Sequence, residues 1–293
     1  TICGMGRGAG NLKTELWLSV LHQQHGIPVD FDALNALTNS FSVLKEKYKW
    51  GTNLPYMVSG AFSLPQDTVM SQVKKRYYSL NAIIEEVGQT GISEISETSF
   101  PKIGNSILAE KALLVGGGNS AVKFSSVLVE FLRMDPEICI IHASSKNVHV
   151  FSDLPNLQIH CLSGSEGKRL EKSCKFEVLE NRMFVVPPKN ISVNNYVPLP
   201  FFKNTFQLKE INFIDTFKTS ATAMAIQIAV QLMAKELFLT GYDGYGEAVT
   251  KDQLELFDEN QFIFDHLKEG QHELAAVTPT FYALPSKSIF SLI

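Results

Sequence analysis

Short apolar segments alternate with helical patterns from residue 109 to the end of the chain, and this alternation restricts the fold more than any other feature. The helical patterns include residues 121–132 and 220–234. Strands that alternate with helices are typical of βαβ units, which form parallel sheets covered by helices. The sequence therefore predicts an α/β fold whose sheet is doubly wound and mainly parallel. Its expected strands are residues 112–115, 138–142, 157–161, 183–186 and 237–240.

A glycine turn follows the first expected strand and leads into the first expected helix. Residues 116–120 read Gly-Gly-Gly-Asn-Ser, and Lys123 lies in the first turn of that helix. Glycines let a ligand approach the backbone closely, and amides at the start of a helix favour an anion. In a Rossmann-like sheet of this kind, ligands bind beyond the carboxyl ends of the strands. We therefore predict a nucleotide or phosphate site that uses Gly116, Gly117, Gly118, Asn119, Ser120, Ser144, Gly241 and Asp243.

The glycine turn does not match a phosphate-binding signature in full. It lacks the Gly-Lys-Ser/Thr ending of a Walker A loop and the third spaced glycine of a dinucleotide fingerprint. Tight packing of the turn alone would also account for its glycines. Asp243 could bind a ribose hydroxyl, a metal ion or an incoming base, or it could bond only to the backbone of its own turn. The hydroxyls of Thr219 and Ser220 are expected to cap the helix that follows them rather than to contact a ligand.

The N-terminal part of the chain is predicted to be helical. Residues 1–3 have the pattern of a buried strand end, and a glycine loop follows them as far as Asn11. Asn11 is a good N-cap for the helical pattern that starts at Leu12. Gly26 before Pro28 is a stop signal for that helix.

Helical patterns continue to residue 88, where a polar segment interrupted by glycine and proline begins. Such a change of composition marks a domain boundary. We therefore predict a helical segment at residues 1–88, a linker at 89–108 and the Rossmann-like α/β domain at 109–293. The aromatic residues of the helical segment are expected to pack in its core or at the interface of a homodimer.

Residues 4–15, Gly-Met-Gly-Arg-Gly-Ala-Gly-Asn-Leu-Lys-Thr-Glu, resemble the last strand and helix of the TIM barrel in metal-dependent pyruvate aldolases. Relatives of these enzymes include 4-hydroxy-2-oxovalerate aldolase, homocitrate synthase and 3-hydroxy-3-methylglutaryl-CoA lyase. Segments 48–51, 54–56 and 63–65 resemble bacterial aldolase-domain proteins associated with surface-polysaccharide genes. The resemblance covers residues 1–88. It implies that this segment is the remnant of a barrel end, in the C-terminal part of a carbon-carbon lyase.

The same resemblance implies a divalent metal, Mg²⁺ or Mn²⁺. The family holds this ion with an aspartate and a His-x-His pair, which would lie before residue 1, and the residue matching Asn11 completes the shell in the lyase branch. Oxygen ligands of this kind suit such ions. Because Asn11 alone cannot hold a metal, we expect residues 1–293 to be inactive as an aldolase unless an N-terminal piece is supplied.

Residues 110–250 resemble a second family, the Rossmann-like domain of archaeal 6-hydroxymethylpterin diphosphokinase-like proteins. Related forms occur in flagellin and surface-glycan modification proteins and in some sialyltransferases. The resemblance rests on residues 114–120, 219–223 and 239–243, although Asn119 replaces the commoner proline. It implies a nucleotide-dependent diphospho- or glycosyl-transferase. A non-catalytic module for ligand binding or dimerisation is the remaining alternative.

The composition of the chain limits its partners and its compartment. Among 293 residues, 26 Lys and Arg stand against 30 Asp and Glu, which gives a net charge of −4. This charge provides no basis for binding nucleic acid or an anionic membrane. No apolar window is long enough for a transmembrane helix, and the four cysteines lack C-x-x-C spacing, as is usual in a reducing cytoplasm. The expected partners are a small-molecule or nucleotide-linked substrate and a second copy of the chain.

Overall fold

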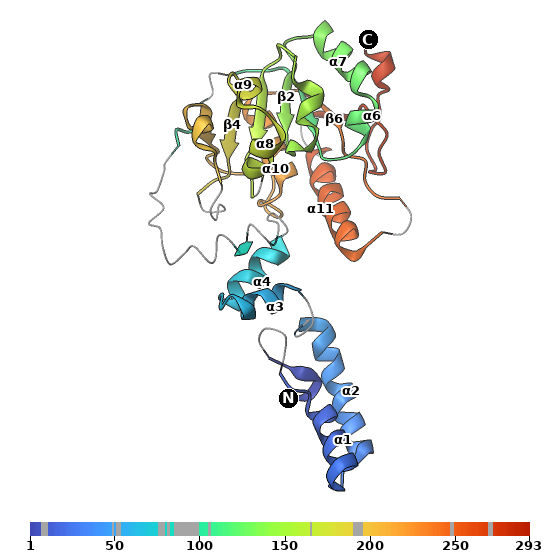
Figure 1. Cartoon of the computed structure of the whole chain (residues 1–293). Helices are drawn as coiled ribbons and strands as arrows, with labels where there is room; N and C mark the ends of the chain where they lie inside the picture. Colours follow the sequence, from blue (N-terminus) through green and yellow to red (C-terminus); the bar gives the residue numbers. More distant parts are fainter. Residues whose placement is uncertain are drawn as a thin grey trace. The chain divides into compact units, whose positions relative to one another are not determined.

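The chain forms two compact units, Thr1–Ser96 and Glu97–Ile293, in a computed structural model. Figure 1 shows helices in the first unit and a sheet with helices in the second. The structure describes residues 1–6, 11–48, 50, 54–75, 80, 83–84, 100–104, 107–164, 166–189, 196–246, 249–268 and 272–293. None of the helices in these ranges combines the length and the apolar content that crossing a lipid bilayer requires.

The second unit is built on a sheet of seven strands in the order β5-β4-β3-β2-β1-β6-β7. Every neighbouring pair is parallel. The order reverses at β1, which lies between β2 and β6, so the predicted doubly wound α/β fold is confirmed. The strands are β1 Lys111–Val115, β2 Cys139–His142, β3 Gln158–Cys161, β4 Met183–Val186, β5 Thr205–Gln207, β6 Glu236–Thr240 and β7 Glu273–Ala276.

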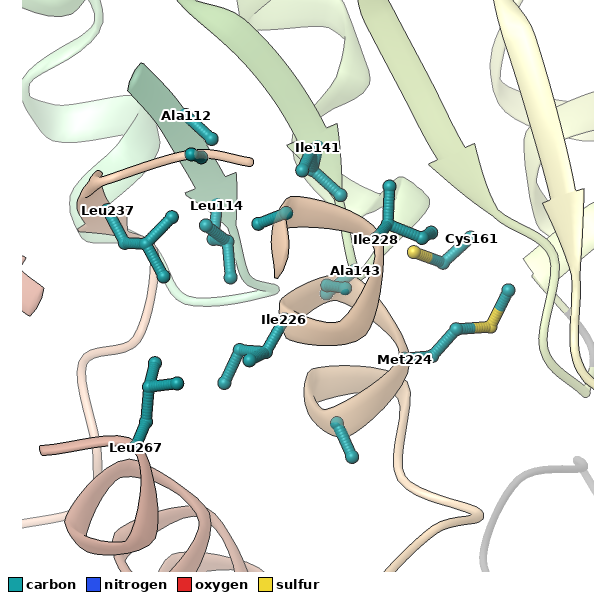
Figure 2. Packing of buried hydrophobic residues seen from close by; sticks show 14 of the residues in the cluster. Ala112, Leu114, Ile141, Ala143, Cys161, Met224, Ile226, Ile228, Leu237 and Leu267 are labelled. Atoms are coloured by element: carbon teal, nitrogen blue, oxygen red, sulfur yellow. The ribbon is translucent and has the colours of Figure 1, made fainter. Parts of the chain in front are cut away.

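The helices of this unit cover both faces of the sheet. Successive side chains of β1 point to opposite faces of the sheet. Leu114 therefore packs on one face, with α10 and α11, and Leu113 packs on the other face, with α7. In Figure 2, Leu114, Ile141 and Cys161 lie on the face where α10 carries Ile228. The helices are α6 Ser120–Lys123, α7 Ser125–Met134, α8 Glu166–Ser173, α9 Phe176–Leu179, α10 Ala221–Gln231 and α11 Lys251–Lys268, with short 3-10 segments η2 Ser145–Phe151, η3 Leu199–Asn204 and η4 Ile289–Ser291.

Two details of the predicted helices differ from the structure. The helix expected over 121–132 is divided into α6 and α7 at Phe124, whose backbone (φ −103°, ψ 17°) leaves the helical region. The helix expected over 220–234 ends earlier, at Gln231, and Met233 takes a positive φ of 65°. Ser220 occupies the N-cap position of α10, but its hydroxyl makes no capping hydrogen bond, so the cap expected from this hydroxyl is wrong.

Among the described residues, the first unit contains η1 Ile2–Gly4 and the helices α1 Thr14–His25, α2 Phe31–Tyr48, α3 Leu54–Ala61 and α4 Gln66–Lys75. The strand end expected at residues 1–3 is wrong, because these residues start a 3-10 turn in which Cys3 has a φ of 52°. Gly26 ends α1 in the left-handed conformation, as predicted. The glycines at 7–10 and most of the linker expected at 89–108 lie outside the described residues.

Asn11 does not cap α1. The helix begins after Lys13, and the Asn11 side-chain amide instead donates to the Met5 carbonyl oxygen at 2.9 Å. This bond holds the Asn11 side chain at Met5, and no side-chain hydrogen bond caps the start of α1. The expected N-cap is therefore wrong by two residues, although the predicted helix is present.

Candidate functional site

The candidate site lies at the carboxyl ends of β1 and β6, where the strand order reverses. Val115 pairs with Thr240 in the sheet, so Gly116 and Gly241 leave the two strands side by side. The Gly116 amide still donates to the Thr240 carbonyl, at 2.9 Å. Strand order and register thus bring together the two glycine segments that the sequence predicted to form one site.

The backbone amides of the glycine turn alternate in direction. The Gly118 amide donates inward to the Gly241 carbonyl at 2.7 Å, and the Ser120 amide donates to Asp243 Oδ2 at 3.0 Å. Gly117 and Asn119, between them, are exposed. Within the described part of the chain, their amides have no hydrogen-bond partner. The amides of Gly117 and Asn119, separated by the inward amide of Gly118, are therefore available to an anion at the surface of the site.

Close approach of the two segments explains two of the glycines in the turn. A Cβ at Gly116 would lie 2.4 Å from the Gly241 carbonyl oxygen, and a Cβ at Gly118 would lie 2.4 Å from Asp243 Oδ1. Gly241 itself has a φ of +69°, which other residues rarely adopt. Tight packing, the simpler alternative, therefore accounts for these three positions.

Gly117 is different, because no backbone atom obstructs it. A Cβ there would first meet flexible side chains, at 3.2 Å from both Lys146 Cδ and Ser144 Oγ. A side chain at this position would fill the space between the turn and the loop that follows β2. Packing within the protein thus gives little reason for glycine at 117, whereas a ligand above the turn would give one.

Asp243 holds the start of α6. Its Oδ1 accepts from the Ser120 hydroxyl at 2.5 Å, and its Oδ2 accepts from the Ser120 amide. The same hydroxyl lies 2.9 Å from Thr278 Oγ1 and accepts from the Gly241 amide at 3.2 Å. Asp243, in the loop after β6, therefore does for α6 what an N-cap side chain would do. The sequence alone does not reveal this role. Its predicted contact with a ligand remains a prediction.

Asn147 completes the shape of the turn, and the sequence analysis missed it. This buried residue of η2 donates from Nδ2 to the Gly116 carbonyl at 2.9 Å and to the Gly118 carbonyl at 2.8 Å. The carbonyl groups of Gly116 and Gly118 share their peptide units with the amides of Gly117 and Asn119. Because C=O and N–H point in opposite directions in a trans peptide unit, holding these two carbonyl groups inward favours the outward direction of those two amides. A single asparagine in a loop after the second strand has no sequence pattern that would identify this role.

The loop after β2 supplies a hydroxyl and a cation beside the turn. Ser144 is half-buried, and its hydroxyl accepts from the Lys146 amide at 3.4 Å. Lys146 is exposed, with its side chain near Gly117. Ser145 anchors this loop, since its amide donates to Glu166 at 2.5 Å, and Glu166 is also paired with Arg169. These contacts hold the backbone of the loop that carries Lys146, the cation beside the glycine turn.

No metal centre accompanies these residues in the described ranges, where no three His, Cys, Asp or Glu side chains form a group that could hold an ion. Asn11 is exposed and belongs to the first unit. Its predicted role as a metal ligand is untested. Cys139 and Cys161 pack in the main core, and burial raises the pKa of the Cys139 thiol to about 12. They act as small apolar side chains.

Comparisons with known proteins give a similarity at the level of the fold. No family model matches the chain, and no curated protein matches it. Among solved structures, the MAf glycosyltransferase from Magnetospirillum magneticum AMB-1 is similar, at 14% sequence identity and a TM-score of 0.43. The similar region covers 67% of this chain and 36% of that glycosyltransferase, so the chain spans about a third of its length.

Proposed function

We propose that the unit of residues 97–293 binds a nucleotide or a nucleotide-linked substrate at the carboxyl ends of β1 and β6. The observation that carries this proposal is the pair of outward, unpartnered amides at Gly117 and Asn119 within the described residues. Ser144 and Lys146 flank these amides on one side. A phosphate group needs several donors and a positive charge, and this arrangement supplies both.

The carboxylate of Asp243 determines on which side of the turn a phosphate would lie. It already accepts two hydrogen bonds at Ser120, where a bound anion would otherwise meet the start of α6. Two negative groups repel each other, so the phosphate is expected beside Lys146 and away from Asp243. The amides of Gly117 and Asn119 face this position without internal competitors in the described residues.

The reaction that we propose is group transfer from a nucleotide, either of a diphosphate or of a sugar. It rests on the resemblance of residues 114–120 and 239–243, whose segments the fold brings side by side at the site. Binding without turnover would favour the alternative, a ligand-binding or dimerisation module. A place in surface-polysaccharide synthesis follows only from the resemblance of residues 1–88 and is proposed on that ground alone.

Calorimetric titration tests the proposed site. CMP, CTP, ATP and GTP are titrated into the wild type and into three variants, Gly117→Val, Lys146→Gln and Lys175→Gln. Each charge-assisted contact contributes about 1.5–3 kcal/mol, so Lys146→Gln should weaken affinity by about tenfold or more. Gly117→Val should abolish binding by placing a side chain between the turn and Lys146.

Lys175→Gln is the matched control. It removes the same charge from an exposed lysine that precedes α9. This lysine lies near the amino end of β4, whereas the candidate site lies at the carboxyl ends of the strands. Its affinity should equal that of the wild type. The proposal fails if no nucleotide binds the wild type at millimolar concentration, or if Gly117→Val and Lys146→Gln bind as tightly as the wild type.

A carbon-carbon lyase activity is implied only by the resemblance of residues 1–88. The aldolase resemblance rests on residues 4–15, of which 7–10 lie outside the described residues. Mg²⁺ or Mn²⁺ would be the metal of that activity, and Asn11 one of its ligands. No arrangement of described side chains adds support to this activity, so it remains a prediction of the sequence.

A further inference from the structure

An exposed phenylalanine lies beside the candidate site, also at the carboxyl ends of the strands. Phe281 is in the loop that follows β7, and 67% of its surface is exposed. Its amide donates to the Asp243 carbonyl oxygen at 2.8 Å. Asp243 in turn accepts from Ser120, at the end of the glycine turn. A continuous series of contacts thus joins the turn, Asp243 and Phe281.

Glycines leave the ring of Phe281 uncovered. A Cβ at Gly246 would lie 3.4 Å from Phe281 Cζ, and a Cβ at Gly244 would lie 3.0 Å from Phe281 Cβ. Gly244 also has a φ of +73°, so its conformation favours glycine for a second reason. Any larger residue at these two positions would lie against the phenylalanine and cover part of it.

Neighbouring aromatic side chains behave differently. Phe257 and Tyr282 stack on each other, with ring centroids 4.5 Å apart and an interplanar angle of 9°. Tyr282 is buried and belongs to the main core. Phe281, which precedes Tyr282 in the chain, makes no ring contact within the described ranges. Its apolar surface therefore contributes little to packing, although leaving such surface in water is unfavourable.

We propose that Phe281 is the stacking platform for the nucleobase of the bound nucleotide. This inference rests on the proposed function and adds the position of the base. The phosphate lies beside Lys146, the base lies on Phe281, and Asp243 stands between them. A flat aromatic ring is the ligand group that an uncovered phenylalanine binds best, and stacking tolerates every base because each has a π face. Phe281 would thus supply affinity for a nucleotide over a sugar phosphate with little preference among bases.

Comparing ligands with and without a base tests the platform. AMP, CMP and ribose 5-phosphate are titrated into the wild type, Phe281→Leu and Phe281→Trp. Stacking of one base on an aromatic side chain corresponds to about fivefold to a hundredfold in affinity. Phe281→Leu should therefore weaken AMP and CMP binding by that factor and leave ribose 5-phosphate unchanged. Phe281→Trp should restore the affinity for both nucleotides.

Phe176→Leu is the control substitution, at an exposed phenylalanine of α9 near the amino end of β4. It should leave all three affinities unchanged. The inference is overturned if Phe281→Leu binds AMP and CMP as the wild type does, or if it weakens ribose 5-phosphate equally. Either result leaves nucleotide binding itself intact. Failure of the wild type to bind any of the three ligands would instead overturn the proposed function, and this inference with it.

Discussion

The imidazole rings of His142 and His160 stack on each other inside the sheet unit, with centroids 4.2 Å apart and an interplanar angle of 2°. They occupy paired positions on β2 and β3, and both residues are 1% exposed. His142 Nε2 bonds to Gln158 Oε1 at 3.0 Å, and His160 Nε2 lies 3.2 Å from Arg182 Nη1. Since the guanidinium only donates, His160 Nε2 is the acceptor and the ring is neutral.

This pair makes the stability of the fold sensitive to acid. Burial lowers the pKa of His142 from 6.5 to about 3, and burial together with the neighbouring His142 and Arg182 lowers the pKa of His160. The unfolded chain therefore binds more protons than the folded chain below pH 6.5. The free energy of unfolding should be constant above that pH and should fall below it, by on the order of 1 kcal/mol per pH unit for each histidine.

Urea unfolding between pH 4.5 and 7.5 measures this effect in the wild type, His160→Gln and His149→Gln. A glutamine at 160 can still accept from Arg182 but does not titrate, so the slope below pH 6.5 should fall by about one proton. His149 is exposed and provides the matched control. A stability that stays constant down to pH 4.5 in the wild type would contradict the argument.

Most of the sheet could be predicted from the sequence because its central strands are buried on both faces. β1, β2, β4 and β6 are mostly apolar, and β3 is buried although it reads Gln-Ile-His-Cys. Short buried segments of this kind in βαβ order leave few alternatives. The two edge strands could not be predicted. β5 has only three residues, and β7 reads Glu-Leu-Ala-Ala, with little preference for extended structure. Their pairing depends on the rest of the sheet.

The location of the candidate site was also predictable, but its internal contacts were not. The rule that ligands bind where strand order reverses placed residues 116–120 beside 241–245. Asn147, Phe281 and the bonds between Ser120 and Asp243 depend on which loops meet in space. These contacts join residues far apart in sequence, and no local pattern specifies them.

Asn147 should be as important for the site as the glycines that it holds. Asn147→Asp keeps the size of the side chain but replaces the donor with a charged acceptor facing two carbonyl groups. The loss of two buried hydrogen bonds predicts a decrease of about 2–4 kcal/mol in the free energy of unfolding. Chemical denaturation measures it, and Asn119→Asp, at an exposed position of the same turn, is the control. Equal stability of the two variants would show that Asn147 is not a structural support.

Gly118 should be needed for stability, whereas Gly117 should be needed for ligand binding. Gly118→Ala forces a methyl group against Asp243 and the Gly241 carbonyl oxygen, which lies 2.6 Å from the added atom. Overpacking of this kind lowers the free energy of unfolding by about 1–3 kcal/mol, so the melting temperature of Gly118→Ala should fall. Gly117→Ala meets only flexible side chains and should melt like the wild type while binding nucleotide more weakly. A large loss of stability in Gly117→Ala would argue against a ligand above that residue.

Asp243→Asn tests the link between the two glycine segments. An asparagine can accept from either the amide or the hydroxyl of Ser120 but not from both, since its other atom is a donor. The variant should lose about 1.5–3 kcal/mol of stability even without ligand. Thr278→Val, which removes only a neighbouring hydroxyl, should cost less. If Asp243→Asn lowers nucleotide affinity without any change in stability, the carboxylate contacts the ligand directly.

Residues 1–293 should release no pyruvate from 4-hydroxy-2-oxo acids in the presence of Mg²⁺ or Mn²⁺. The described residues contain no group of three acidic, histidine or cysteine side chains that could hold such an ion. Asn11, the ligand that the aldolase resemblance implies, uses its side-chain amide to close its own loop at Met5. A coupled assay that consumes pyruvate measures the activity, with the metal-free protein as the baseline. Metal-dependent turnover that Asn11→Ala abolishes would contradict this prediction and would place a working metal site within residues 1–293.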